Sequence, residues 1–194
     1  MKKIFVIILL TFANQLFGQE YSLDSVKMYE WSEVLAADPD TIFGITFEKK
    51  KLDELPQELS NFKRLISLNL KKNRLTSLPD YFGEFKDLVD LNLEKNKLEY
   101  YPIQLCKIAS IKYLRLGANL FKNVPECIEY TTELIYLDLY DTPIYKIPNS
   151  LLNLKNLKVV DLSGIQFSPA FQKSWIENSA NIKFVFDAPC DCFD

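Results

Sequence analysis

The 194-residue sequence contains no histidine and only five glycines. The absence of histidine removes the commonest general base and the commonest metal ligand together. Few glycines and no low-complexity tract argue against a disordered or linker-rich chain. The sequence also lacks the glycine-rich phosphate-binding loops and the G-x-S-x-G turn of hydrolases. We therefore expect a protein that is not an enzyme and that uses no cofactor and no metal.

The charge and the apolar runs exclude two further classes of partner. The formal net charge is −3 at pH 7, and we find no block of basic residues, so nucleic-acid binding is not expected. Beyond the N-terminus, no apolar run reaches the length that spans a bilayer. We therefore predict a chain without a membrane span, and we expect it to be a monomer.

The N-terminus has the pattern of a secretory signal peptide. In MKKIFVIILLTFANQLFG, residues 1–18, Lys2 and Lys3 precede an apolar run at residues 4–10 that is short for a membrane helix. We predict cleavage after Gly18, with Ala13 as the alternative. The loss of two lysines would move the formal charge from −3 to about −5. Together with the capped repeat described below, this signal suggests an exported bacterial protein of the periplasm, the cell surface or the medium.

From residue 42 onward the chain repeats every 23 residues without an insertion. Six units begin, at offset 0, with Ile42, Leu65, Leu88, Ile111, Leu134 and Leu157. Apolar residues recur at offsets 3, 5 and 10, and proline recurs at offset 14 of the first five units. Offsets 3 and 5 have the same parity, so they face one side of a short strand. Apolar residues at offsets 17 and 20 suit a short helical return. One unit cannot bury its own apolar face, so the units must stack.

Asparagine occupies offset 8 in three units, as Asn73, Asn96 and Asn119. A chain that turns a buried corner leaves backbone amides and carbonyls without partners, and an amide side chain can both donate and accept. We predict that these asparagines form a structural ladder that closes the corners. Lys50, Thr142 and Ile165 stand at offset 8 of the first, fifth and sixth units, where we expect altered geometry.

This pattern, L-x-x-L-x-L-x-x-N-x-L-x-x-L-P-x-x-L-x-x-L, resembles the leucine-rich repeat family in its 23-residue form with a Leu-Pro convex side. The resemblance covers residues 42 to about 187. It implies an α/β fold, a right-handed solenoid or horseshoe, with a parallel concave sheet of about seven strands and short convex helices. It also implies an exported bacterial protein that binds other macromolecules on its concave face.

Both ends of the repeat carry cap signals. Residues 23–37 place four apolar residues on one helical stripe: Met28, Trp31, Val34 and Leu35. Ser22 or Asp24 could cap that helix. At the other end, Ser168 and Pro169 begin a helix that would bury Phe171, Trp175 and Ile176, before a last strand that points Ile182, Phe184 and Phe186 inward. We divide the chain into signal peptide 1–18, helical cap 19–41, six repeats 42–167 with the last one partial, helix-strand cap 168–187 and a cysteine-containing tail 188–194.

The four cysteines are Cys106, Cys127, Cys190 and Cys192. An even number in an exported chain suggests disulfides, and four cysteines allow three connectivities. Cys106 and Cys127 lie on the convex returns of neighbouring units, where they either face each other or point apart. Cys190 and Cys192 are separated by one residue, so a bond between them would be strained. We expect a flexible tail whose cysteines pair with each other or with a partner.

The outward-facing side chains of the sheet are the candidate binding residues. Our predicted partner-binding set comprises Tyr113, Arg115, Tyr136, Asp138, Tyr140, Asn92 and Asp161. Tyrosine and arginine are enriched at interface hot spots, so we favour a protein or peptide partner. Three alternatives stay open: tyrosines that only stabilise strands, with Arg115 paired to Asp138; a glycan stacked on the tyrosines; and a purely structural envelope protein.

Overall fold

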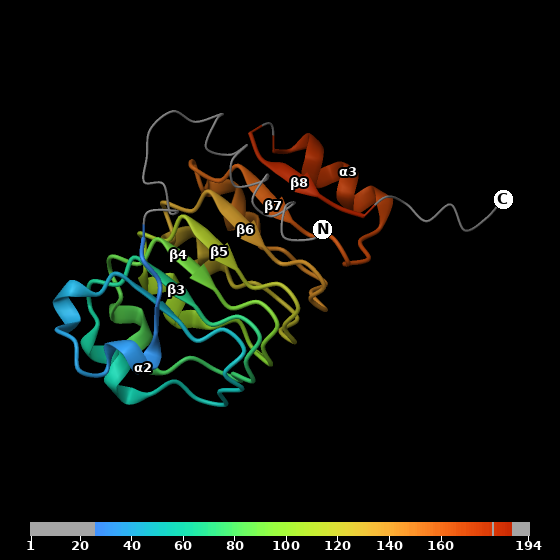
Figure 1. The fold of residues 1–194 in the computed structure, drawn as a ribbon. Helices are drawn as coiled ribbons and strands as arrows, with labels where there is room; N and C mark the ends of the chain where they lie inside the picture. The colour runs from blue at the N-terminus through green and yellow to red at the C-terminus, as the bar shows by residue number, and fades with distance from the viewer. Residues whose placement is uncertain (1–25, 180, 188–194) are drawn as a thin grey trace.

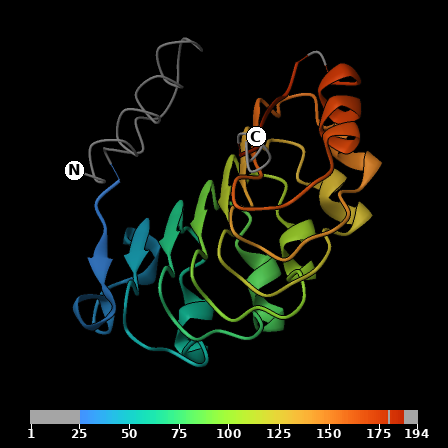
Figure 2. The ribbon, with the colours of Figure 1, turned by 90° about the vertical axis from the view of Figure 1, so that its right-hand side faces the viewer.

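Each repeat contributes one three-residue strand to a single parallel sheet, and the strands follow one another in chain order. The computed structural model describes residues 26–179 and 181–187. Eight strands lie side by side along the inner side of a curved solenoid (Figures 1 and 2). They are β1 Tyr29–Glu30, β2 Gly44–Thr46, β3 Ser67–Asn69, β4 Asp90–Asn92, β5 Tyr113–Arg115, β6 Tyr136–Asp138, β7 Val159–Asp161 and β8 Lys183–Val185. Between β2 and β7 the register is the 23-residue repeat itself, as in the pairing of Leu91 with Leu114.

The return path on the convex side is a 3-10 helix in every unit from the first to the fifth. These helices are η3 Gln57–Asn61, η4 Asp80–Glu84, η5 Ile103–Lys107, η6 Glu126–Tyr130 and η7 Asn149–Asn153. The repeated proline at offset 14 is the residue immediately before each helix, in extended conformation. Its fixed φ and missing amide suit that place, since the first turn of a helix leaves its amides unbonded.

The core lies between the sheet and these returns. In the third unit, Leu88, Leu91, Leu93 and Leu98 are fully buried, as the spacing predicts. Each such side chain contributes about 1.5–3 kcal/mol relative to an exposed one. Because each leucine packs on its equivalents in the units above and below, the stacked array shares one continuous core.

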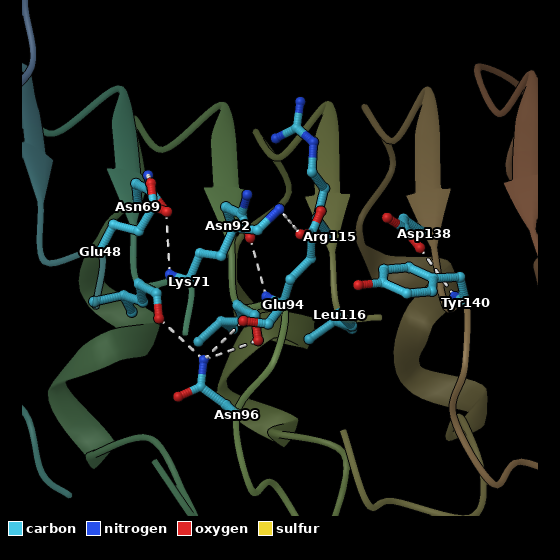
Figure 3. Close-up of polar contacts among 12 residues, drawn as sticks. Glu48, Asn69, Lys71, Asn92, Glu94, Asn96, Arg115, Leu116, Asp138 and Tyr140 are labelled. Carbon is cyan, nitrogen blue, oxygen red and sulfur yellow. Dashed lines mark hydrogen bonds and ion pairs between the residues drawn. The ribbon is translucent and has the colours of Figure 1, made fainter. Parts of the chain in front are cut away.

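The asparagine ladder forms as predicted. Asn96 donates to the carbonyls of Leu70 (3.0 Å) and Leu93 (2.9 Å), and its oxygen accepts from the amide of Leu75 (3.1 Å). Asn73 and Asn119 make the same three contacts one unit earlier and one unit later. Each asparagine therefore ties its own corner to the corner of the preceding unit, as Figure 3 shows for Asn96.

The corners that lack asparagine differ, as expected. At the first corner Lys51 takes a left-handed conformation (φ 59°) in addition to Lys49 (φ 61°). At the fifth, the Thr142 hydroxyl donates to the Leu139 carbonyl (2.6 Å), which replaces one of the asparagine contacts. Pro143, at offset 9, has no backbone amide. It therefore cannot donate the bond to the preceding unit that the residues at offset 9 of the second, third and fourth units donate, namely Arg74, Lys97 and Leu120.

The N-terminal cap is less helical than the sequence suggested. Our prediction of a helix over residues 23–37 was wrong in extent, because α2 covers only Trp31–Val34. Tyr29 and Glu30 instead form β1, which pairs with β2 and covers the amides and carbonyls of that edge. Trp31 packs on Phe47, with ring centroids 5.1 Å apart, and Val34 is buried, whereas Leu35 is 63% exposed. Glu30 is the N-cap residue of α2, and it forms a capping box with Glu33. Ser22 and Asp24, the caps that we predicted, lie outside the described residues.

The C-terminal cap agrees with the prediction in most respects. Helix α3, Pro169–Glu177, begins after Ser168, whose hydroxyl accepts from the amide of Phe171. Trp175 is buried and Phe171 stacks on Phe167, but Ile176 is 56% exposed, so its predicted burial was wrong. Strand β8 then pairs with β7 and buries Phe184. The sheet has eight strands, one more than predicted, and the additional strand is β1 at the N-terminal end.

Cys106 and Cys127 face each other and form a disulfide that links the returns of units three and four, with Cα atoms 5.6 Å apart. Cys190, Cys192 and the predicted signal peptide lie outside the described residues. Within the described part of the chain, none of the helices is long and apolar enough to cross a bilayer.

Candidate partner-binding face

The side chains at offset 4 of each unit lie in a row along the concave face, and most of them bond to their own strand end. In five of the six units an oxygen at offset 4 accepts from the backbone amide at offset 6. The acceptors are Thr46, Asn69, Asn92, Asp138 and Asp161, at 2.9–3.2 Å. A hydroxyl, an amide or a carboxylate serves equally as this acceptor. These five residues therefore cap their strand ends, as Figure 3 shows for Asn69, Asn92 and Asp138. Since any acceptor suffices for the cap, the residue type at offset 4 can vary for another purpose.

Arg115 is the exception in the fourth unit, because guanidinium has no acceptor atom. Its side chain reaches back to Asp90 on β4, with 2.5 Å between Nη1 and Oδ1. Burial alone would lower the pKa of Arg115, but the charge of Asp90 and its hydrogen bond raise it above the usual value. The alternative pairing of Arg115 with Asp138 was wrong. The amide of Gly117, at offset 6, consequently lacks the cap that its equivalents have.

The missing side chain of Gly117 makes room for Tyr140. A Cβ atom built on Gly117 would overlap the Tyr140 ring and would lie 3.0 Å from Oδ1 of Asp138. The ring projects from unit five toward unit four (Figure 3). Tyr113 and Tyr136 are register partners on β5 and β6, so they stand side by side at offset 2. All three tyrosines are partly exposed. The predicted cluster of three tyrosines thus spans two adjacent units.

Asp138 lies deep in this cluster, with only 5% of its surface exposed. The pKa of its carboxyl is raised to about 7, chiefly by burial and also by the nearby charges of Glu94 and Asp161. The hydrogen bond from the Tyr140 amide and the charge of Arg115 act in the opposite direction. Burial also raises the pKa of Tyr140 to about 12 and that of Tyr136 above its ordinary value. Asp138 is therefore a buried acid, although it stands on the outward-facing side of the sheet.

Asp138 and Asp161 are register partners on β6 and β7, and Asp161 accepts from both the amide and the hydroxyl of Ser163 (2.9 and 2.6 Å). On the N-terminal side, Asn92 is joined by Glu94, which is 7% exposed and paired with Lys71. Among the described residues, no group of three or more acidic or cysteine side chains is arranged to hold a metal ion. The arrangement offers a half-buried acidic and aromatic surface for contact with a ligand.

The structure brings together five of the seven predicted binding residues, namely Tyr113, Arg115, Tyr136, Asp138 and Tyr140. Asn92 and Asp161 flank them on the neighbouring strands. Sequence reasoning missed Asp90, the partner of Arg115, and Glu94, whose charge acts on Asp138. Asp90 lies at offset 2 of the unit before Arg115, so pairs between offsets 2 and 4 of successive units are a signal that could have indicated it.

Comparisons with known proteins identify the fold. No family model matches the sequence, and no curated protein matches it. Among solved structures, a leucine-rich repeat protein of Leptospira interrogans superposes on 75% of this chain and 43% of its own, with a TM-score of 0.61 and 21% identity. Internalin C2 of Listeria monocytogenes superposes on 75% of this chain and 62% of its own, with a TM-score of 0.61 and 20% identity. The chain thus spans less than two thirds of either protein, and it has the leucine-rich repeat fold.

Proposed function

We propose that this protein is an exported, non-catalytic binding module that recognises another protein or a peptide through its concave face. The binding site is centred on the fourth and fifth units, on Tyr113, Tyr136 and Tyr140 around Asp138. Arg115, Asn92 and Asp161 form its rim. The two similar structures are bacterial leucine-rich repeat proteins, which supports this class of function without defining a partner.

The observation that carries the proposal is the burial of Asp138 among partly exposed tyrosines. The cap at offset 4 requires only an acceptor, and Asn69 and Asn92 supply it at the same place without a charge. A carboxylate that burial drives toward protonation is a costly replacement for an amide. Its benefit therefore lies outside the fold, in the recognition of a partner that presents a cationic group to Asp138 and Asp161, with tyrosine rings on either side.

The experiment is affinity capture of partners from cell-envelope and host extracts. The bait is the chain from Gln19 onward, compared with a variant that carries Tyr113→Ser, Tyr136→Ser and Tyr140→Ser. The matched control carries Tyr100→Ser, Tyr130→Ser and Tyr145→Ser, three tyrosines of the third to fifth units that lie away from the concave sheet and are 81%, 61% and 68% exposed. Circular dichroism first verifies that all three proteins fold.

A partner retained by the wild type and the control variant but lost by the concave-face variant supports the proposal. Equal retention by all three baits contradicts it, and loss only with the control variant would move the binding site to the convex side. If free neutral oligosaccharides displace the retained partner, we would conclude that this face binds a glycan rather than a peptide.

A further inference from the structure

A second surface lies at the corner where the chain leaves the strands of the first three units. At offsets 7 and 9 of these units, every side chain is exposed and cationic. We call these six residues the basic corner: Lys49, Lys51, Lys72, Arg74, Lys95 and Lys97. The fourth and fifth units have Ala118 and Leu120, then Asp141 and Pro143, at the same offsets. The charge therefore belongs to one half of the solenoid, in a chain whose formal charge is −3.

The backbone at this corner does not favour lysine. Offset 7 is left-handed in all six units, with φ between 50° and 76°, and Gly164 is the glycine among them. Glycine tolerates this conformation best, because a Cβ atom crowds the following carbonyl. Asparagine and aspartate come next, because their short polar side chains can hydrogen-bond locally. Lysine nevertheless occupies offset 7 in three consecutive units, and Lys51 adds a fourth left-handed lysine at offset 9. A residue type that is unfavourable for the turn and recurs there points to a role for its charge.

Backbone hydrogen bonds place these cations in two rows. The amides of Lys49, Lys72 and Lys95 donate to the carbonyl at offset 6 of the next unit, at 2.9–3.0 Å. The amides of Arg74 and Lys97 donate to the carbonyl at offset 10 of the preceding unit, at 2.8–2.9 Å. Both rows therefore advance at about the strand spacing of 4.7–4.9 Å. Like charges held at this interval repel one another.

Acids within the protein neutralise little of this charge. Lys49 pairs with Glu48 (3.3 Å), and Lys72 has a longer-range interaction with the same carboxylate. Among the described residues, the other four members of the basic corner form no ion pair. Asp53, Glu54 and Glu99 follow at offsets 11 and 12 and limit the positive strip to the two rows. The surface is thus a narrow, regular line of cations.

We propose that the basic corner binds a linear acidic polysaccharide that runs across the units, with a carboxylate or sulfate on successive sugars. Such a polymer carries its charges at intervals of about one sugar ring, which is commensurate with the ~4.8 Å advance of the rows. A flat anionic membrane surface would also lie against the acidic residues that border the strip, and these would repel it. Single-stranded nucleic acid would gain little, because neither row contains an aromatic side chain for its bases. The site is independent of the concave-face site.

The test measures binding of the chain from Gln19 onward to heparin, with neutral dextran and phosphatidylglycerol vesicles as comparison ligands. The variant carries Lys51→Asn, Lys72→Asn and Lys95→Asn, three left-handed lysines without an ion pair. The control carries Lys63→Asn, Lys107→Asn and Lys155→Asn, three exposed lysines with the same total charge. We expect roughly tenfold weaker heparin binding for the first variant at low salt and less than about twofold for the control.

A second measurement separates a functional from a structural role for these lysines. Asparagine suits the left-handed conformation and relieves the repulsion, so the corner variant should melt about 2–6 °C higher while it binds heparin more weakly. A lower melting temperature would show that the lysines serve the fold. Equal loss of heparin binding in both variants, or binding of the wild type to the vesicles and not to heparin, would overturn the proposal.

Discussion

The first three and the last three units have the same backbone but different concave faces. In the first half, Thr46, Asn69 and Asn92 cap the strand ends with neutral groups, and the one buried carboxylate, Glu94, is paired with Lys71. In the second half, Arg115 does not cap its strand end, because it bonds to Asp90 instead. Asp138 caps its strand end with a carboxylate, and only 5% of its surface is exposed. The fold accommodates either kind of cap, and the charged cap of the second half is the basis of the binding site that we propose there.

The units also differ in how regular their corners are. Asn73, Asn96 and Asn119 each make three contacts that join successive corners, whereas Thr142 makes one and Ile165 makes none through its apolar side chain. The stiff ladder therefore belongs to the second, third and fourth units. The tyrosine cluster stands where that ladder ends.

The largest expected effect comes from breaking the ladder. Asn96→Ala should lower the free energy of unfolding by about 3 kcal/mol, because three buried hydrogen bonds are lost and the Leu75 amide is left without its partner. The carbonyls of Leu70 and Leu93 keep their bonds from Asn73 and Asn119. Thr142→Ala should cost only about 1 kcal/mol, since one carbonyl loses a bond. Urea denaturation of both variants measures this difference. Equal losses would show that the asparagine and threonine corners depend equally on their side chains.

A smaller effect is expected where Gly117 contacts Tyr140. Gly117→Ala should destabilise the protein by about 1–3 kcal/mol, because the new methyl group overlaps the Tyr140 ring. Gly83→Ala is the control in the first half, since its Cβ would meet the flexible Lys107 side chain at 2.9 Å, which can move. Tyr140→Ala should rescue most of the Gly117→Ala loss. A double variant as unstable as the single one would place the strain elsewhere.

The smallest expected effect is a gain in stability, on the order of 1–2 kcal/mol at pH 8, from Asp138→Asn. The asparagine keeps the cap on the Tyr140 amide and removes the buried charge. In the wild type the folded-state pKa of about 7 lies above the ordinary 3.8. Stability from this residue is therefore greatest below pH 3.8, falls as the pH rises toward 7 and is lost above it.

Asp138→Asn should flatten this part of the pH profile, as followed by urea denaturation from pH 4 to 8. Asp161→Asn, at the same offset of the next strand and partly exposed, is the control and should change the profile less. A wild-type profile that does not fall between pH 4 and 7 relative to Asp138→Asn would contradict the proposed burial of the charge.

The repeat made most of the fold predictable, because its 23-residue spacing specifies strand, corner and return together. The asparagine contacts and the buried leucines such as Leu91 follow from that spacing alone. The edges were harder: β1 forms because Tyr29 and Glu30 find a neighbouring strand, and no periodicity within residues 23–37 carries that information. The site was predictable as a set of outward offsets. The burial of Asp138 and the pairing of Arg115 with Asp90 depend on side-chain contacts between units, which a single strand pattern does not encode.

The most direct test of the account combines stability and binding in one variant. A partner captured by the wild type is titrated against the wild type and Asp138→Asn at pH 8, beside their free energies of unfolding. The account predicts a protein that is more stable and binds the partner several-fold more weakly. Unchanged or tighter binding by a stabilised Asp138→Asn would contradict the claim that this half of the concave face is reserved for recognition.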